Sequence, residues 1–263
     1  MARAPTDRLP AVSSALAVIA HPDDESFGLG AVLSALVDAG VKVTAICFTH
    51  GEASTLGANG GDLHQARAAE LADAARTLGL GRVELLGHPD GELARIPIAQ
   101  LADEVVRAAR RDQSELLVTF DEGGITGHPD HQHATDAARA AAEHLGLPVL
   151  AWAVPEAVAA ALNTEFATAF VGRAAGEIDI AFPVERARQL QAIACHRSQS
   201  TANPVLWRRL ELTGRHGAGV RRTGRHRTGG HGTGGHRTGG HRTGGHRTGG
   251  DRAVLCRRGV GPA

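Results

Sequence analysis

The sequence predicts an α/β fold in which a mostly parallel, Rossmann-like sheet is flanked by helices. Short apolar or β-branched runs, typical of buried strands, alternate with longer amphipathic stretches, and this alternation is the pattern of βαβ units. A chain of 263 residues is long enough for one sizeable domain with a continuous core. The expected strands are residues 15–20, 41–49, 82–87, 115–120 and 148–154.

The stretches between these runs predict helices near residues 28–39, 63–79, 96–111 and 131–145. In the second of them, apolar side chains recur at helical spacing and most charged side chains lie on the other face. The pattern is weaker in the rest of the chain, where it predicts a helix over 155–163, a strand over 177–182 and a helix over 184–196.

Cysteine usage and the N-terminal pattern indicate a cytoplasmic protein. The three cysteines lie far apart and form no C-x-x-C pair, which favours a reducing compartment over a disulfide framework. Arg3 and Arg8 precede an apolar run, as in a signal peptide, but the run is short and contains serines, so we expect it to form the first strand. No apolar stretch approaches the ~20 residues of a membrane helix, and we expect no membrane association.

Residues 215–263 differ in character from the domain that we expect over residues 1–214. They contain 11 arginines and one acid, so an acidic body is followed by a basic tail. Much of the tail repeats His, Arg, Thr and two glycines, with no apolar side chain to bury, which predicts disorder. Three interpretations stay open: an inert tail, an arm that binds metal or nucleic acid weakly, and a tandem expansion that displaced an older C-terminus.

The tripeptide His-Pro-Asp occurs three times, at residues 21–23, 88–90 and 128–130. Residues 21–25 come directly after the first strand, and residues 126–133 follow the strand at 115–120 through a Gly-Gly loop. In a parallel sheet, ligands bind outside the carboxyl ends of the strands. We therefore expect the two clusters to meet at one edge of the sheet.

Together the clusters offer two histidines and one acid, drawn from His21, Asp23, Asp24, His128 and His131. Such a set, with one position left for water, is a catalytic zinc arrangement, and it also suits Fe²⁺. The two adjacent aspartates project differently, so one can bind the metal while the other acts as general base on a metal-activated water.

The motifs "AHPDDE" (20–25) and "TGHPDH" (126–131) resemble those of the PIG-L/LmbE family of zinc-dependent N-acetylglucosaminyl deacetylases, which includes enzymes of mycothiol and bacillithiol biosynthesis. The resemblance extends to about Gly214 and takes in "HGEAS", the "R-x-x-E" of Arg67 and Glu70, "PDG", "CHRSQS" and "PVLWRRLEL". It implies an enzyme that binds Zn²⁺ and acts on a small amino-sugar substrate.

By this resemblance, His21, Asp24 and His131 would bind zinc, and Asp23 would be the general base. One position departs from part of the family. Thr126 stands where some mycothiol-pathway relatives have a tyrosine, and the chain contains no tyrosine at all. This departure weakens an assignment to that subgroup.

The resemblance implies roles for four more residues. His128 would be a cation that stabilises the oxyanion, and Asp130 would orient it. Arg67 and Asp90 match positions that hold sugar hydroxyls in relatives. Both would therefore bind substrate.

Other polar residues of these motifs have simpler interpretations. A lone histidine in a loop is usually solvated, and an acid after a strand often only caps a helix. We expect structural roles for Glu25, Glu52 and Glu70, an incidental role for His88, and a helix-surface position for His133.

These observations predict a metal-dependent hydrolase that removes acetate from an N-acetylated amino sugar. A related amidase, acting on a thiol conjugate or an antibiotic intermediate, would carry the same motifs, because they encode the reaction and not the leaving sugar. A third hypothesis is a non-catalytic protein that binds metal or nucleic acid through the His/Arg tail. Apart from weak binding through that tail we expect no nucleic-acid partner, and the sequence carries no indication of the oligomeric state.

Overall fold

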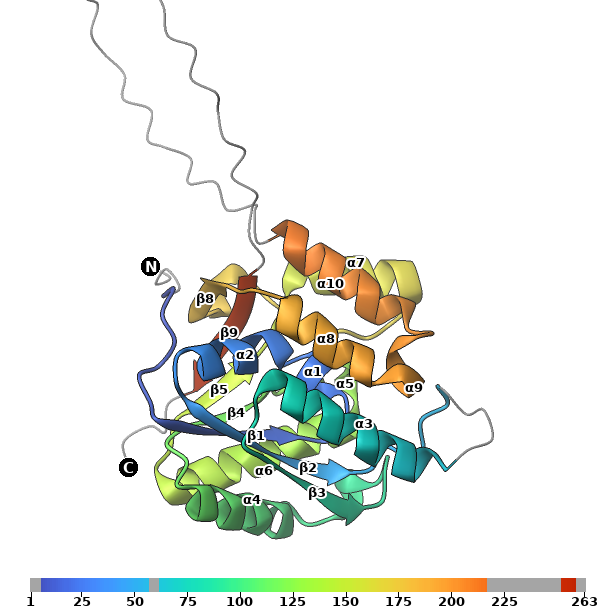
Figure 1. The fold of residues 1–263 in the computed structure, drawn as a ribbon. Helices are drawn as coiled ribbons and strands as arrows, with labels where there is room; N and C mark the ends of the chain where they lie inside the picture. The colour runs from blue at the N-terminus through green and yellow to red at the C-terminus, as the bar shows by residue number, and fades with distance from the viewer. Residues whose placement is uncertain (1–5, 57–61, 217–251, 259–263) are drawn as a thin grey trace, which may run out of the picture.

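A seven-stranded sheet forms the centre of the fold (Figure 1). The computed structural model describes residues 6–56, 62–216 and 252–258. The strands of this sheet are β1 (Ser14–Ile19), β2 (Lys42–Thr49), β3 (Arg82–His88), β4 (Leu117–Phe120), β5 (Val149–Trp152), β8 (Ile180–Pro183) and β9 (Arg252–Arg258). Their order is β3-β2-β1-β4-β5-β9-β8; the first five run parallel, and β9 runs antiparallel to both of its neighbours. A separate two-stranded sheet pairs β6 (Val154–Pro155) with β7 (Gly172–Arg173).

Strand β1 is buried on both faces, which explains why its sequence is a continuous apolar run. Its side chains alternate between two core clusters: Ala15, Ala17 and Ile19 belong to one, and Leu16 and Val18 to the other. The sheet therefore needs helices on both faces.

Those helices come from the segments between the strands (Figure 1). On one face, α4 (Ile98–Asp112) and α6 (Pro129–Leu145) pack against each other and share a core cluster with β1. On the other face, α8 (Ala187–Cys195) packs against α2 (Gly30–Asp38) and α3 (Leu63–Leu78). The remaining helical elements are α1 (Asp24–Phe27), α5 (Gly124–Gly127), α7 (Glu156–Phe166), α9 (Arg197–Ser200), α10 (Pro204–His216) and the 3₁₀ turns η1 (Leu93–Arg95) and η2 (Ala175–Glu177).

Local sequence signals account for the helix ends. Asp62 caps α3 by accepting a hydrogen bond from the backbone N–H of Gln65, and Gly79 ends the helix at a φ of 80°. Pro129 is the first residue of α6, where its missing N–H costs nothing, and Gly146 ends that helix at a φ of 67°.

The predicted fold class is confirmed, and the run after Arg8 contains strand β1 as expected. The expectation of a disordered tail over 215–263 is wrong for residues 252–258, which form β9 between β5 and β8. The physical reason is a short apolar run after the repeat: Leu255 is fully buried and joins the main core cluster. The predicted disorder of the repeat itself concerns residues 217–251, which lie outside the described residues.

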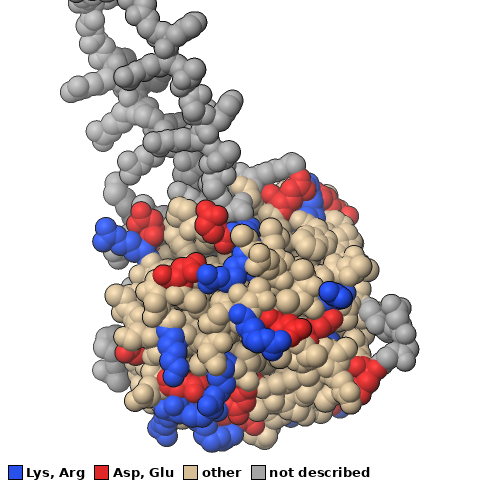
Figure 2. Space-filling view, in the orientation of Figure 1, with Lys and Arg blue, Asp and Glu red and all other residues tan. Residues whose placement is uncertain are grey.

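Acidic and basic side chains lie next to one another on the face shown in Figure 2. One exposed ion pair among the described residues joins Arg95 to Glu92. Such exposed pairs contribute little to stability individually. Among the described helices, none is long and apolar enough to cross a membrane.

Candidate metal centre and active site

The site lies where the order of the sheet strands reverses. Strand β1 has β2 on one side and β4 on the other, and α/β sheets bind ligands at such a switch point, outside the carboxyl ends of the strands. Residues 21–24 follow β1, while α5 and the start of α6 follow β4. Both segments line one cavity of about 510 Å³. The fold therefore brings the two sequence clusters together.

Three side-chain donors converge in this cavity. His21 Nδ1 lies 3.2 Å from His131 Nε2, which in turn lies 3.1 Å from Asp24 Oδ1. His21 Nδ1 is also 3.8 Å from Asp24 Oδ2. His21 and Asp24 are buried, and His131 is partly buried. These are the three residues that the resemblance selects as metal ligands.

The hydrogen bonds of the two imidazoles direct their lone pairs toward each other. His131 Nδ1 lies 3.1 Å from the carbonyl oxygen of Gly124, so Nδ1 carries the proton and Nε2 the lone pair. His21 Nε2 lies 3.1 Å from Asp90 Oδ1 and 3.3 Å from Asp130 Oδ2, so Nε2 carries the proton and Nδ1 the lone pair. When both rings are neutral, two lone pairs and a carboxylate oxygen face one another, an arrangement that a divalent cation satisfies.

The surroundings of these donors stabilise positive charge. Burial opposes the charge of His21, but its contacts with Asp130 and Asp90 and the charge of Asp24 raise its pKa to about 10. Burial also opposes the charge of Asp24, yet the charges and hydrogen bonds of His131 and His21 lower the pKa of this carboxyl. Two imidazoles and one carboxylate are a donor set that fits Zn²⁺ or Fe²⁺.

Asp23 lies beside the metal donors in a strained backbone conformation. Its φ is 110°, which non-glycine residues rarely adopt; such strain costs about 1–3 kcal/mol and is concentrated at functional sites. Its Oδ2 accepts a hydrogen bond of 2.8 Å from Arg67 Nη2. Burial and the charge of Asp24 raise the pKa of Asp23 to about 6, although the charge of Arg67 opposes this shift. The carboxylate can therefore exchange a proton near neutral pH.

A buried pair behind the cavity holds the backbone of Asp23. Glu25 Oε2 accepts a hydrogen bond of 3.0 Å from the N–H of Asp23, and Glu25 Oε1 lies 2.6 Å from His196 Nε2. Both side chains of this pair are completely buried. Glu25 thus has the structural role expected of it, and His196, to which the sequence assigned no role, is its partner.

Arg67 and Asp90, the two predicted substrate-binding residues, line the cavity but are engaged by protein groups. Arg67 is 3% exposed and donates to Asp23 and to the carbonyl oxygen of Gly51, the latter over 2.6 Å. Asp90 contacts His21 through Oδ1, and its Oδ2 accepts the N–H of Ala53 over 2.8 Å. In this structure Arg67 positions the carboxylate of Asp23, and Asp90 positions the ring of His21.

Asp130 supports His21, whereas the resemblance implied that it orients His128. Its carboxylate accepts backbone N–H groups from Gly91 and Leu93, over 2.8 and 3.1 Å, and contacts His21 Nε2. His128 is the N-cap of α6 and uses Nδ1 to accept the N–H of Asp130 over 3.2 Å. The capping geometry therefore joins His128 to the backbone of Asp130 and leaves the carboxylate for His21.

The same capping bond makes His128 a neutral donor. With Nδ1 as an acceptor, the ring proton lies on Nε2. Burial and the charges of His21 and His131 lower the pKa of His128. The resemblance implies a cation at this position, and that role stays a prediction; with Nδ1 engaged in the cap, His128 can offer an Nε2–H to the cavity that its ring lines.

Four further polar residues of the motifs contact other protein groups and are not among the described residues that line the cavity. Glu52 accepts the N–H of Asp90, Glu70 accepts hydrogen bonds from Ser198, His88 contacts Glu104, and His133 contacts the carbonyl oxygen of Pro129.

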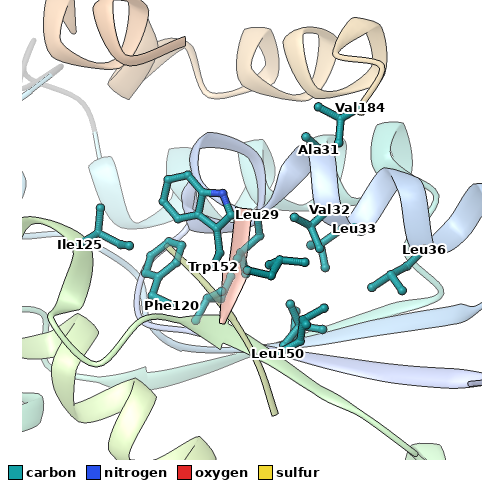
Figure 3. Packing of buried hydrophobic residues seen from close by; sticks show 14 of the residues in the cluster. Leu29, Ala31, Val32, Leu33, Leu36, Phe120, Ile125, Leu150, Trp152 and Val184 are labelled. Atoms are coloured by element: carbon teal, nitrogen blue, oxygen red, sulfur yellow. The ribbon is translucent and has the colours of Figure 1, made fainter. Parts of the chain in front are cut away.

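The cavity also has a wall that the sequence motifs did not mark. Phe27, Phe120, Ile125 and other apolar side chains line it, and Figure 3 shows Ile125 beside Phe120 with the indole of Trp152 next to that phenylalanine. The ring centres of Phe120 and Trp152 are 5.8 Å apart. Arg209 of α10 lines the same cavity. The one signal for α10 was the segment "PVLWRRLEL", which carries no local pattern of a binding site.

Comparison with protein families matches residues 16–142 to the PIG-L family, described as GlcNAc-PI de-N-acetylase. A curated relative, the 1D-myo-inositol 2-acetamido-2-deoxy-α-D-glucopyranoside deacetylase of Nakamurella multipartita, is 30% identical over 237 residues. The match covers 70% of this chain and 78% of that relative. Both of the His-Pro-Asp clusters that supply residues to the cavity lie within the matched family region.

Two solved structures share the fold. The 4-carboxy-2-hydroxymuconate hydratase GalB of Pseudomonas putida has a TM-score of 0.67 at 18% identity, with 96% of this chain and 98% of that chain covered. The N,N′-diacetylchitobiose deacetylase of Pyrococcus horikoshii has a TM-score of 0.58 at 21% identity, with coverage of 78% and 80%. A hydratase and a deacetylase thus share one architecture, so the fold alone does not select the reaction. The sequence match does identify the family: the chain belongs to the PIG-L family of de-N-acetylases.

Proposed function

We propose that this chain is a zinc-dependent N-deacetylase that hydrolyses the acetamide of an N-acetylated amino sugar to acetate and a free amine. Membership of the PIG-L family supports the reaction class. The observation that carries the proposal is the convergence of donor atoms from His21, Asp24 and His131 beside Asp23, whose backbone is strained.

Each residue of this group has a separate task. His21, Asp24 and His131 would hold the metal, and when bound, Zn²⁺ acts as a Lewis acid that acidifies a water and polarises the amide carbonyl. Asp23 accepts the proton of the attacking water, because its pKa of about 6 leaves it ionised at neutral pH. Arg67 holds that carboxylate in place through its hydrogen bond of 2.8 Å.

His128 and Asp23 complete the reaction. The Nε2–H of His128 donates to the oxyanion that develops on the carbonyl oxygen. The N–H of a neutral imidazole is too weak an acid to protonate the departing amine, so the proton comes from Asp23, which received it from water. As the C–N bond breaks, Asp23 returns to its ionised form, and acetate and amine leave.

The test is release of amine and acetate from a panel of N-acetylated sugars by the zinc-loaded protein and its Asp23→Asn variant. The panel contains free N-acetylglucosamine and four compounds that represent substrates named for relatives: N,N′-diacetylchitobiose, N-acetylglucosaminyl-inositol, N-acetylglucosaminyl malate and a mycothiol S-conjugate. Asp136→Asn, an exposed site on α6, is the matched control. Zinc content is measured for each protein.

We expect Asp23→Asn to lose ~10²-fold or more of the rate while retaining zinc, because the variant lacks only the base. Asp136→Asn should match the wild type. Faster turnover of the S-conjugate than of any sugar would favour the amidase alternative. A folded, zinc-loaded wild type that releases no amine from any member of the panel would refute the proposal.

A further inference from the structure

We propose that Arg209 recognises an acidic group, a carboxylate or a phosphate, that the substrate carries in addition to its acetamide. The inference rests on the proposed function, since it concerns the same cavity, and it narrows the substrate class to N-acetylated amino sugars with an acidic substituent.

Arg209 is a buried cation that forms no salt bridge with an acid among the described residues, although the charges of Asp24 and Asp23 also act on it. The residue is 7% exposed. Its Nη2 donates to the carbonyl oxygen of Phe27, and its Cζ lies 5.0 Å from the ring centre of Trp152. Neither contact neutralises the charge, and a buried charge without an opposite charge is unfavourable.

Two neighbouring arginines form the salt bridges with acids that Arg209 lacks. Arg67, which lines the same cavity, is paired with Asp23. Arg208, the residue before Arg209, points away from the cavity and contacts two acids, Glu165 and Glu211. Arg209 thus lines the cavity without forming a salt bridge to any of the described protein groups.

The guanidinium of Arg209 has the geometry and the N–H donors to bind an anion. It carries five N–H donors in a planar fork, and its stacking on Trp152 restrains that plane while the bond to Phe27 uses one donor. Carboxylates and phosphates match such a fork with two parallel hydrogen bonds. Burial and the charge of Arg186 lower the pKa of Arg209 to about 10, although the charges of Asp24 and Asp23 oppose this shift, so the group stays charged at neutral pH.

The charges of the cavity also determine which end of the substrate lies where. Asp23 and Asp90 line the cavity near the metal donors, and these carboxylates would repel an acidic group. The apolar neighbours of Arg209 in the cavity, Val205 and Leu206, strengthen an ionic hydrogen bond by excluding water. The acidic group therefore binds at α10 and the acetamide at the metal centre.

The test measures binding rather than turnover. Three probes are titrated by calorimetry into zinc-loaded Asp23→Asn protein: the N-acetylglucosaminide of glycolic acid, its neutral glycolamide isostere, and N-acetylglucosamine 1-phosphate. The same titrations are made after Arg209→Met or Arg209→Lys has been added to the Asp23→Asn protein. Arg209→Met removes the charge but retains a side chain that can lie on Trp152. Arg208→Met on the same helix is the matched control.

We expect the carboxylate or the phosphate probe to bind roughly 10- to 100-fold more tightly than the glycolamide, as for a charged hydrogen bond. Whichever anion is preferred identifies the chemistry of the natural group. Arg209→Met should abolish the preference without weakening the glycolamide, Arg209→Lys should retain part of it, and Arg208→Met should retain all of it.

Equal affinities for the three probes in the background protein, or a preference that survives Arg209→Met, would overturn the proposal. Far-UV circular dichroism and thermal unfolding establish that each variant is folded. If Arg209→Met does not fold, the loss of part of the anion preference in Arg209→Lys tests the proposal instead. Because binding is the readout, an anion preference without any deacetylation would contradict the proposed reaction and leave the role of Arg209 standing.

Discussion

His196 Nε2 lies 2.6 Å from Glu25 Oε1, and neither side chain has any exposed surface. Burial opposes the charge of His196, but the charge of Glu25 and the hydrogen bond between them raise its pKa above the ordinary value of 6.5. Because Glu25 also accepts the N–H of Asp23, this pair links the packing of α8 to the backbone of the proposed base.

The stability that this pair contributes should depend on pH. A raised pKa in the folded state means that the contribution is complete below about pH 6.5 and is lost as the pH rises through the folded-state pKa. We expect His196→Gln to lower the free energy of unfolding by about 3–5 kcal/mol at about pH 6 and by much less at about pH 9. Urea unfolding at both pH values checks this, with His133→Gln as control; equal losses at both would contradict it.

Asp130→Asn should weaken metal binding although Asp130 contributes no donor atom to the proposed ligand set. The carboxylate holds the proton of His21 on Nε2 and thereby the lone pair on Nδ1. Loss of such a supporting group typically costs about 10–100-fold in metal affinity. Competition titration with a zinc chelator measures this for Asp130→Asn and the exposed Asp136→Asn. If Asp130 instead oriented His128, turnover would fall while zinc affinity stayed unchanged.

Gly51→Ala should impair catalysis through Arg67. A Cβ at Gly51 would overlap the guanidinium of Arg67, which positions Asp23. Gly40 provides a matched control, since its φ of 84° resembles the 66° of Gly51 but no heavy atom lies within 4 Å of its Cβ position. Both alanines carry the left-handed backbone cost of about 1–2 kcal/mol.

The displaced guanidinium gives Gly51→Ala an additional effect on rate. We expect kcat/KM to fall on the order of 10²-fold, as for a catalytic group moved by about 1 Å, whereas Gly40→Ala should keep the wild-type value. Steady-state kinetics together with thermal unfolding separates the two contributions. Equal activity of the two variants would show that Arg67 does not position the base.

Leu255→Ala should destabilise the whole domain. Leu255 lies opposite Trp152 of β5 and Ile180 of β8 and is fully buried in the main core cluster. Truncation of a buried leucine costs about 2–5 kcal/mol. Chemical denaturation measures the free energy of unfolding. Leu190→Ala, at a position that is 42% exposed, should change this free energy little. An unchanged midpoint for Leu255→Ala would mean that β9 is dispensable.

Much of the site could be predicted because its ligands are adjacent in sequence to the strands that place them. His21, Asp24 and His131 follow or lie near strand ends, and the rule for parallel sheets is enough to bring such residues together. The roles of Asp130 and His128 could not be predicted this way. They depend on backbone N–H groups of Gly91 and on a helix cap, which exist only once the loops are folded.

Two features of the molecule could be identified only from the three-dimensional structure. Arg209 lies in a helix with no site-like motif, and its meaning comes from what surrounds it: Trp152 and Phe27 are far from it in sequence. Strand β9 is a single short apolar run after a long polar repeat, and its pairing with β5 and β8 is non-local. The composition of residues 215–263 predicted a disordered tail, but it did not indicate that residues 252–258 add a strand to the sheet.

Strand β9 occupies an internal position in the sheet, yet it is the last of the described strands to be synthesised. After α10 is complete, a ribosome that adds about 5–20 residues per second needs a few seconds to pass through residues 217–251 and deliver β9. During this interval the edge of β5 and the whole of β8 lack their partner, and exposed strand edges promote association between chains. Production of this protein should therefore be sensitive to ribosome stalling within the repeat, although the catalytic residues have all been made by then.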